Sequence, residues 1–109
     1  MANKVRQEVV RVLQEARVTV AKGWCQHRFA QRIGQVNLYW TDDADAYCIA
    51  AAVNRAELIH GKGPEAWNLI RRVIGSDPIS WQDQPGRTQT EVLGVIDRAI
   101  ALAAAVSSP

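Results

Sequence analysis

Apolar residues in the first fifth of the chain follow a helical period. They recur at intervals of three and four positions, which places them on one face of an α-helix. These residues are Val5, Val9, Val12, Ala16 and Val20. Charged residues of alternating sign lie on another face, and Lys22 and Gly23 at the end of the stretch are typical of a helix C-terminus. The pattern predicts an amphipathic first helix that ends near residue 22.

The segment 48–53 is apolar on every side of a helix and contains three alanines. A helix without a polar face is enclosed by its neighbours. Thr41, Asp42 and Asp43 precede this segment with the oxygen atoms and negative charge that favour a helix N-terminus. We therefore predict a helix over residues 44–60 at the centre of the domain, covered by the other helices.

A shorter helix is predicted after residues 61–63, which break the central helix. Pro64 suits the first position of this helix, and Gly75 follows its last residue. Its inner face is expected to consist of Ala66, Trp67, Ile70, Val73 and Ile74. Arg71 and Arg72 are expected to point away from the core.

The last predicted helix covers residues 88–106. Thr88 and Glu91 have the spacing of a capping box, in which each side chain bonds the backbone N–H of the other residue. The residues expected to face the core are Val92, Val95, Ile96, Ala99, Ile100, Ala103 and Val106. Residues 76–87 contain two prolines and a glycine, and they predict a long loop.

The pattern between residues 24 and 40 is less regular. Segments with aromatic and β-branched residues flank Gly34 and Gln35, which favours a short β-hairpin. Two strands alone are only marginally stable, so such a hairpin would pack on the helices. An ordered loop is the alternative.

Length and composition fit one globular domain. The chain has 109 residues, of which 48% are apolar and 22% charged. Apolar runs stay short of the ~20 residues of a membrane span, the start of the chain lacks a signal-peptide pattern, and two cysteines do not make a disulfide framework. We predict a mostly α-helical cytoplasmic domain over 1–106. It has four helices, a hairpin or ordered loop between the first two, and a disordered tail at 107–109.

Three segments carry a resemblance to a known family. They are 23–26 (GWCQ), 47–52 (YCIAAA) and 81–92 (WQDQPGRTQTEV). In order and spacing they resemble a family of small bacterial and phage proteins catalogued as a domain of unknown function. The resemblance spans most of the chain, and the third segment is its most specific part. It implies the fold and the candidate positions but no activity. The segment between the first two motifs is commonly polar in that family, whereas here it is rich in aromatic residues.

The candidate ligand or partner surface lies in the two connections with aromatic residues, 24–40 and 76–87. Its residues are Trp24, Cys25, His27, Trp40, Trp81, Asp83 and Arg87. In the second connection, Trp81 is suited to anchor the loop on the core, and Asp83 to accept hydrogen bonds from backbone N–H groups. The functional alternative is that Asp83, Arg87 and free N–H groups near a helix N-terminus bind an anion.

The two cysteines offer little chemistry by their spacing. Cys25, His27, Cys48 and His60 are zinc-ligand types, but the spacing of Cys25 and His27 is not that of a usual zinc site. A nucleophilic pair of Cys25 and His27 lacks an evident third group to orient it. We expect no metal and no cofactor, and whether the cysteines pair with each other stays open. An acidic cluster at 42–45 suits a hard cation, or more simply a helix cap.

The functional prediction rests on the absence of catalytic motifs and on the two aromatic connections. We predict a non-catalytic interaction or regulatory module that binds another protein, with a homodimer as one arrangement. The first alternative is a small-molecule or anion binder, with or without catalysis, whose pocket lies near Cys25, Asp83 and Arg87. The second is weak binding of nucleic acid through aromatic and basic side chains. These are Arg28, Arg32, Arg71, Arg72, Arg87, Trp24, Tyr39 and Trp40. A net charge of +2 does not favour this second alternative.

Overall fold

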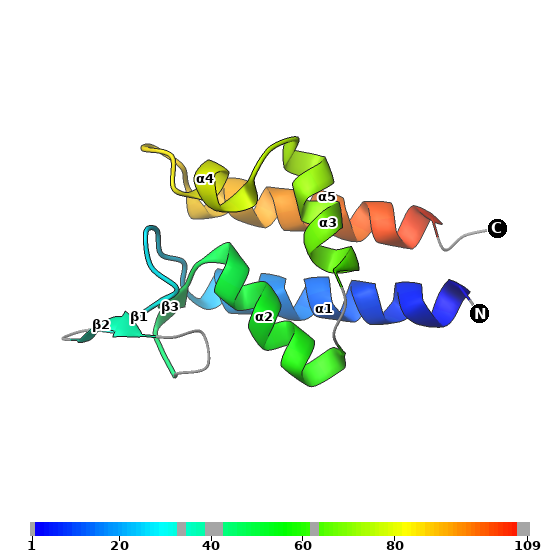
Figure 1. Cartoon of the computed structure of the whole chain (residues 1–109), viewed down its shortest axis with the longest axis horizontal. Helices are drawn as coiled ribbons and strands as arrows, with labels where there is room; N and C mark the ends of the chain where they lie inside the picture. The colour runs from blue at the N-terminus through cyan, green and yellow to red at the C-terminus, as the bar shows by residue number, and fades with distance from the viewer. Residues whose placement is uncertain (1, 33–34, 39–42, 62–63, 107–109) are drawn as a thin grey trace.

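The fold of the chain is given by a computed structural model, which describes residues 2–32, 35–38, 43–61 and 64–106 (Figure 1). Its helices are α1 (Ala2–Lys22), α2 (Ile49–His60), α3 (Glu65–Ile74), α4 (Pro78–Gln82) and α5 (Gln89–Val106). Its strands are β1 (Ala30–Arg32), β2 (Gln35–Leu38) and β3 (Ala46–Tyr47). The mostly helical fold with a hairpin between the first two long helices is confirmed. The predicted tail at 107–109 lies outside the described residues.

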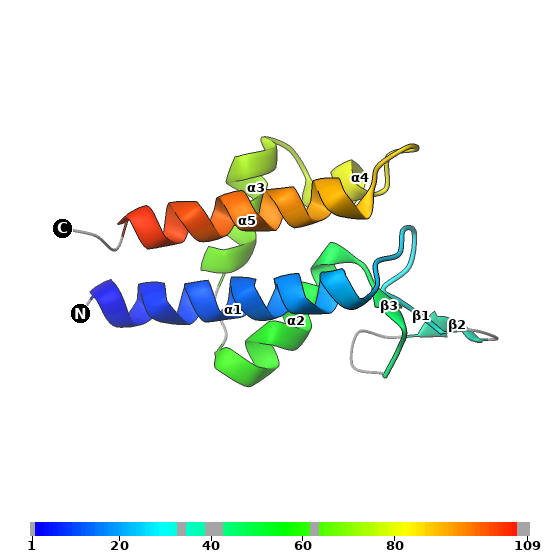
Figure 2. The same cartoon turned by 180° about the vertical axis from the view of Figure 1, so that it is seen from behind.

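Helix α1 forms the middle of the helical layer. It runs antiparallel to α5, and α2 packs on it from the other side (Figures 1 and 2). The prediction that the helix near 44–60 is the centre of the domain is therefore wrong. Only the first half of α2 is apolar on all sides, and Leu58 and Ile59 near its end are exposed. The small alanine side chains allow α2 to lie close to α1, although neighbouring elements do not surround α2 along its whole length.

The core is filled by aliphatic side chains, most of them at predicted positions, and Leu13 of α1 is buried although it is not part of the predicted stripe. Its members with less than 2% exposure from α1, α2 and α5 include Leu13, Ala16, Val20, Ile49, Val53, Val92, Val95, Ile96, Ala99 and Ala103. Ile49 and Val53 are buried, as expected for the apolar segment 48–53. In α3, Leu69 is buried beside the predicted Ala66 and Ile70, while Arg71 and Arg72 are exposed as expected.

A small sheet lies beyond the end of α1. Strand β1 pairs antiparallel with both β2 and β3, in the order β2-β1-β3. The antiparallel pair of β1 and β2 confirms the predicted hairpin and removes the alternative of a loop. Trp24, just after α1, also forms a parallel bridge with Tyr47. The sheet thus connects the end of α1 with the start of α2.

The second helix starts later than predicted. Residues 46–47 are held in β3 by their pairing with β1, so α2 begins at Ile49 instead of residue 44. Cys48 takes the N-cap position, and its Sγ accepts a hydrogen bond from the N–H of Ala51 at 3.4 Å. Of the predicted cap residues, Asp43 lies outside any helix, and Thr41 and Asp42 lie outside the described residues.

The predicted loop at 76–87 contains the short helix α4, which is a second correction. Asp77 is its N-cap: the carboxylate accepts hydrogen bonds from the N–H and the hydroxyl of Ser80, both at 2.9 Å. These hydrogen bonds lower the pKa of Asp77. Pro78 occupies the first turn, where its missing N–H is not needed. The Asp77 cap and Pro78 at the first turn are local signals of a helix, but Pro78 and Pro85 together favour a loop in the sequence.

The start of α5 confirms the predicted capping box. The hydroxyl of Thr88 accepts from the N–H of Glu91 at 3.2 Å, and the Glu91 carboxylate accepts from the N–H of Thr88 at 3.0 Å. The side chain of Gln89 also donates to the carbonyl of Val20 at 2.7 Å, which satisfies the last turn of α1. None of the helices within the described residues has the length and apolar character needed to span a membrane.

Candidate functional site

The side chain of Gln82 joins three parts of the chain that are far apart in the sequence. It is the last residue of α4 and is 1% exposed. Its Oε1 accepts hydrogen bonds from the indole Nε1–H of Trp24 at 2.7 Å and from the backbone N–H of Ile49 at 3.2 Å. Its Nε2 donates to the backbone carbonyl of Cys25 at 3.4 Å. We call Trp24, Cys25, Ile49 and Gln82 the Gln82 junction.

The carboxamide of Gln82 replaces a hydrogen bond of the parallel ladder. Trp24 and Tyr47 form the parallel bridge, in which the N–H of Cys25 donates to the carbonyl of Tyr47 at 3.3 Å. In a continued ladder the next bond would join the N–H of Ile49 to the carbonyl of Cys25. Both groups bond to the Gln82 side chain instead. The amide therefore satisfies two backbone groups at the point where α2 turns away from the sheet.

Glycine is required where the chain leaves α1. A Cβ atom on Gly23 would overlap the backbone oxygen of Asp45, which belongs to the segment that leads into β3. The carbonyl of Gly23 accepts from the N–H of Tyr47 at 3.0 Å. The absence of a side chain thus allows the two segments to approach closely enough for the bridge to form.

Gln26 and His27 also bind residues at the end of α4. The Nε2 of Gln26 donates to the carbonyls of Gln82 at 2.8 Å and Gln84 at 2.9 Å. The N–H of His27 donates to Oδ1 of Asp83 at 2.9 Å, which confirms that Asp83 accepts from a backbone N–H group. His27 has a positive φ of 65°, uncommon for a residue with a side chain. Its hydrogen bond to Asp83 helps to hold this conformation.

Trp81 and Arg87 form a separate contact between the end of α4 and the start of α5. The Nε of Arg87 donates to the carbonyl of Trp81 at 2.9 Å, and its guanidinium lies 3.9 Å from the centre of the Trp81 ring. The same side chain donates to Glu91 at 3.0 Å. These bonds fix the turn between α4 and α5. The side chain of Arg87 therefore has a structural role. It is not among the described residues that line the pocket described in a later paragraph.

The two thiols are buried and reduced. Cys25 and Cys48 are both free, and each is less than a tenth exposed. Burial raises the pKa of Cys25 to about 11, with a further contribution from a negative charge on Cys48. Burial also raises the pKa of Cys48, against the lowering effect of the N–H groups at the start of α2. Both groups are therefore neutral thiols near pH 7.

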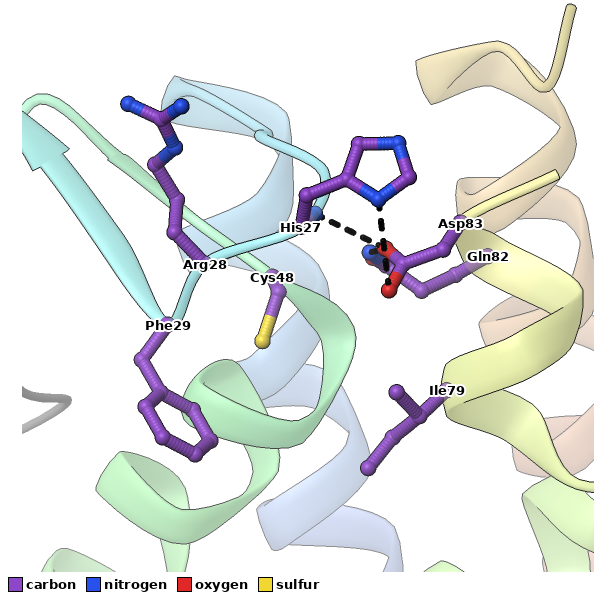
Figure 3. A pocket seen from close by; sticks show the side chains of 7 residues that line it. All are labelled: His27, Arg28, Phe29, Cys48, Ile79, Gln82 and Asp83. Atoms are coloured by element: carbon purple, nitrogen blue, oxygen red, sulfur yellow. Dashed lines mark hydrogen bonds and ion pairs between the residues drawn. The ribbon is translucent and has the colours of Figure 1, made fainter. Parts of the chain in front are cut away.

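A pocket of about 210 Å³ opens between the end of α4 and the segment before β1 (Figure 3). It is lined by His27, Arg28, Phe29, Cys48, Ile79, Gln82 and Asp83. The Cys48 sulfur points toward its interior, with Phe29 and Ile79 on either side, whereas the Arg28 side chain is turned away (Figure 3). Nδ1 of His27 lies 3.8 Å from Oδ2 of Asp83 at the upper edge. We refer to these seven residues as the pocket.

The structure divides the predicted surface residues into groups. Trp24, Cys25, His27 and Asp83 lie together around the Gln82 junction, and His27 and Asp83 also line the pocket. Trp81 and Arg87 lie at the α4–α5 turn, and Trp40 lies outside the described residues.

Sequence reasoning missed Gln82, Phe29 and Ile79 as parts of the site. Gln82 stands within the most specific motif, between Trp81 and Asp83, and that position was the available signal. Nothing in the local pattern marks the other two residues. The sequence offers Cys48 as a buried thiol, a zinc ligand or a partner of Cys25, and its place in the pocket follows from the fold.

The alternative metal sites are not assembled in the described part of the chain. There, no group of three or more His, Cys, Asp or Glu side chains is arranged to hold a metal ion. Cys48 and His60 lie at opposite ends of α2, about 18 Å apart along a helix of this length. His60 instead contacts Glu15 at 3.4 Å. Asp43 and Asp45 line a second, polar pocket of about 240 Å³ beside α1, together with the basic residues Lys22 and Arg55.

The arginines proposed for nucleic-acid binding are distributed over different parts of the molecule. Arg32 donates to the backbone carbonyl of Asp43, and Arg87 is held by Trp81 and Glu91. Arg71 and Arg72 are exposed on α3, while Arg28 lies at the pocket. Of the aromatic residues, Trp24 uses its N–H inside the Gln82 junction, and Tyr39 and Trp40 lie outside the described residues.

Comparison with known protein families gives one match over most of the chain. Residues 4–102 match the model of a family described as a family of unknown function (DUF6197). No curated protein and no solved structure matches the chain.

Proposed function

The chain belongs to this family of unknown function, and we propose that it is a non-catalytic binding module whose pocket accepts a bulky apolar side chain of a partner protein. The observation that carries the proposal is the position of Phe29 and Ile79. They are 46% and 45% exposed and flank Cys48 at the pocket (Figure 3). Exposed apolar side chains around a concavity are typical of sites where one protein binds another.

The size of the pocket favours one side chain over a whole metabolite. Its volume is about 210 Å³, whereas sites for small molecules typically measure about 300–1,000 Å³. Protein interfaces commonly place a single aromatic or large aliphatic residue in a pocket of this kind, and such anchors supply much of the binding energy.

Three of the polar residues at the pocket, His27, Gln82 and Asp83, are bonded to one another. Asp83 accepts from the backbone N–H of His27 and from the side-chain amide of Gln82. Groups in this arrangement hold the shape of the pocket, whereas those of a metabolite or catalytic site converge on the bound molecule. The small-molecule or anion alternative ranks second. It expects Cys25 and Arg87 near the pocket, and neither is among the described lining residues.

The position of Arg28 predicts a second feature of the partner. Its side chain is exposed at the pocket, directed away from Phe29 and Ile79, and forms no ion pair with a described residue. A carboxylate on the partner next to the apolar anchor would be attracted to this guanidinium. The proposed partner segment therefore combines a bulky apolar residue with a neighbouring Asp or Glu.

A displayed library of random peptides, selected on the immobilised chain, tests this proposal. We expect selected peptides to share a bulky apolar residue beside an acidic one. Ile79→Glu places a charge in the pocket wall and should abolish their binding. Arg28→Glu should weaken peptides with an acidic neighbour and favour those with a basic one.

Leu58→Glu is the matched control for Ile79→Glu. Leu58 is 59% exposed and lies near the end of α2, so the same change of side chain occurs away from the pocket. Circular dichroism establishes that each variant is folded. Binding that survives Ile79→Glu, or that is lost equally with Leu58→Glu, would show that the pocket is not the binding site.

A further inference from the structure

Cys25 and Cys48 occupy facing positions on two neighbouring segments. Trp24 and Tyr47 form the parallel bridge, and each cysteine is the next residue along its segment. The backbone of Cys48 is still extended, with φ −77° and ψ 169°. Neighbouring strands run about 4.7–4.9 Å apart, and facing residues direct their side chains to the same side. Disulfides join residues whose Cα atoms are about 4.4–6.8 Å apart, so this backbone arrangement suits a disulfide.

The two thiols are equally buried and close to each other, but they differ in their access to the pocket. They are 6% and 7% exposed, and a negative charge on Cys48 raises the pKa of Cys25, an effect that requires proximity. Of the two cysteines, only Cys48 is among the described residues that line the pocket, and its sulfur points between Phe29 and Ile79 (Figure 3). A small reagent that enters the pocket therefore meets Cys48 before Cys25.

We propose that Cys25 and Cys48 are a redox site that closes to a disulfide by exchange with a low-molecular-weight disulfide, RSSR. Both thiols are neutral near pH 7, so only the fraction that has lost its proton to solvent reacts. The Cys48 thiolate formed in this way attacks one sulfur of RSSR, the S–S bond of the reagent breaks, and RS⁻ leaves as a mixed disulfide forms on Cys48. The Cys25 thiolate then attacks the Cys48 sulfur and releases the second RS⁻. The protons lost by the two cysteines convert both RS⁻ to RSH. Two thiols are thereby oxidised to one disulfide, and RSSR is reduced to two RSH.

Closing the disulfide changes the floor of the pocket. In the reduced chain the Cys48 sulfur accepts the N–H of Ala51 and faces the pocket. Bonded to Cys25, it turns toward the Gln82 junction and leaves that N–H without its cap. We expect oxidation to weaken partner binding. This last step rests on the proposed function, whereas the pairing of the cysteines does not.

The whole chain, equilibrated with 2-mercaptoethanol and its disulfide at a series of ratios, tests the pairing. Acid quenching followed by mass spectrometry distinguishes the products. We expect a monomer that has lost two hydrogen atoms, with residues 25 and 48 linked in a proteolytic digest. Reduced chain or mixed disulfide alone at every ratio would overturn the proposal, as would disulfides only between molecules.

Single variants test the order of events. Cys25→Ser should accumulate a mixed disulfide on Cys48, because the second exchange is removed. Cys48→Ser should leave Cys25 largely unmodified in the folded chain, since it does not line the pocket. Faster formation of the mixed disulfide on Cys25 in Cys48→Ser than on Cys48 in Cys25→Ser would overturn the proposed order. A disulfide that forms without any change in peptide binding would support the pairing and contradict its effect on the pocket.

Discussion

The helical interface formed by α1, α2 and α5 is stabilised by different physical means from the Gln82 junction, which is called the corner below. The first is filled by aliphatic side chains such as Leu13, Val53 and Ile96, each 1% exposed or less. The second is joined by one carboxamide that bonds an indole N–H and two backbone groups. Packing is non-directional and spread over many atoms, whereas a hydrogen bond depends on individual donors and acceptors.

This difference determines how each region responds to change. In the helical interface, the loss of one side chain leaves a cavity that neighbours partly fill, and the cost depends on how far they relax. At the corner, removal of one amide leaves several polar groups buried without partners, and no neighbour of the same chemistry can replace it. The pocket is built on the corner, so its shape depends on the hydrogen bonds of Gln82 and Asp83.

The largest effect is expected from a cavity in the helical interface. Leu13→Ala should lower the free energy of unfolding by about 2–5 kcal/mol, because a fully buried side chain is truncated. Denaturant titration measures it. Val18→Ala on the same helix is the control, since Val18 is 48% exposed and should change stability by at most about 0.5 kcal/mol. Similar effects of the two variants would contradict the assignment of the buried face.

Loss of the amide should be the next largest effect. Gln82→Met keeps the length of the side chain but leaves the N–H groups of Trp24 and Ile49 without an acceptor. At about 1–3 kcal/mol for a buried unsatisfied group, partly offset by relaxation, we expect a loss of about 2–4 kcal/mol. Thermal and denaturant unfolding measure it. Gln84→Met, at an exposed position two residues later, should be nearly neutral. Equal stability of the two variants would remove the distinction between core and corner.

A smaller effect is expected where the backbone segments meet. Gly23→Ala introduces a methyl group against the backbone oxygen of Asp45, and the bridge to Tyr47 must open to admit it. We expect a loss of about 1–3 kcal/mol, the usual range for overpacking. In Gly94→Ala the methyl group enters open space within α5, and stability should rise by about 0.5–1 kcal/mol. A neutral Gly23→Ala would mean that the close approach is not needed.

Alkaline pH should weaken the corner more than the helical interface. Cys25 has a pKa of about 11 in the folded chain against 9.0 for an unperturbed thiol, so the unfolded chain releases the proton first. Stability from the neutral thiol is complete below pH 9 and declines as pH rises toward 11, by about 1–2 kcal/mol near pH 10.5. Unfolding titrations of the wild type and Cys25→Ser at several pH values measure the difference. Parallel curves would contradict the burial of this thiol.

The two regions also differ in how far the sequence predicts them. The intervals between Val9, Val12 and Val20 place the buried face of α1 directly, because helical periodicity is a local property. The capping box at Thr88 and Glu91 is local as well. These features were predicted, and the structure confirms them.

The corner depends on contacts between distant segments, which local patterns do not carry. Residues 46–47 form a strand only because β1 lies beside them, and this pairing delays the start of α2 until Cys48 can cap it. Gln82 has no feature of its own that marks it as buried. Its role appears only when Trp24, 58 positions away in the sequence, is placed beside it. The candidate positions were therefore only partly found, and Phe29 and Ile79 were not expected at the pocket.

A double-mutant cycle between Trp24 and Gln82 tests most directly whether the corner depends on this amide. Trp24→Phe, Gln82→Met and the double variant are unfolded in denaturant together with the wild type. The hydrogen bond from the indole N–H to Oε1 predicts a coupling free energy of about 0.5–1.5 kcal/mol, so that the double variant is less destabilised than the sum of the single ones. Additive effects of the two substitutions would contradict the account.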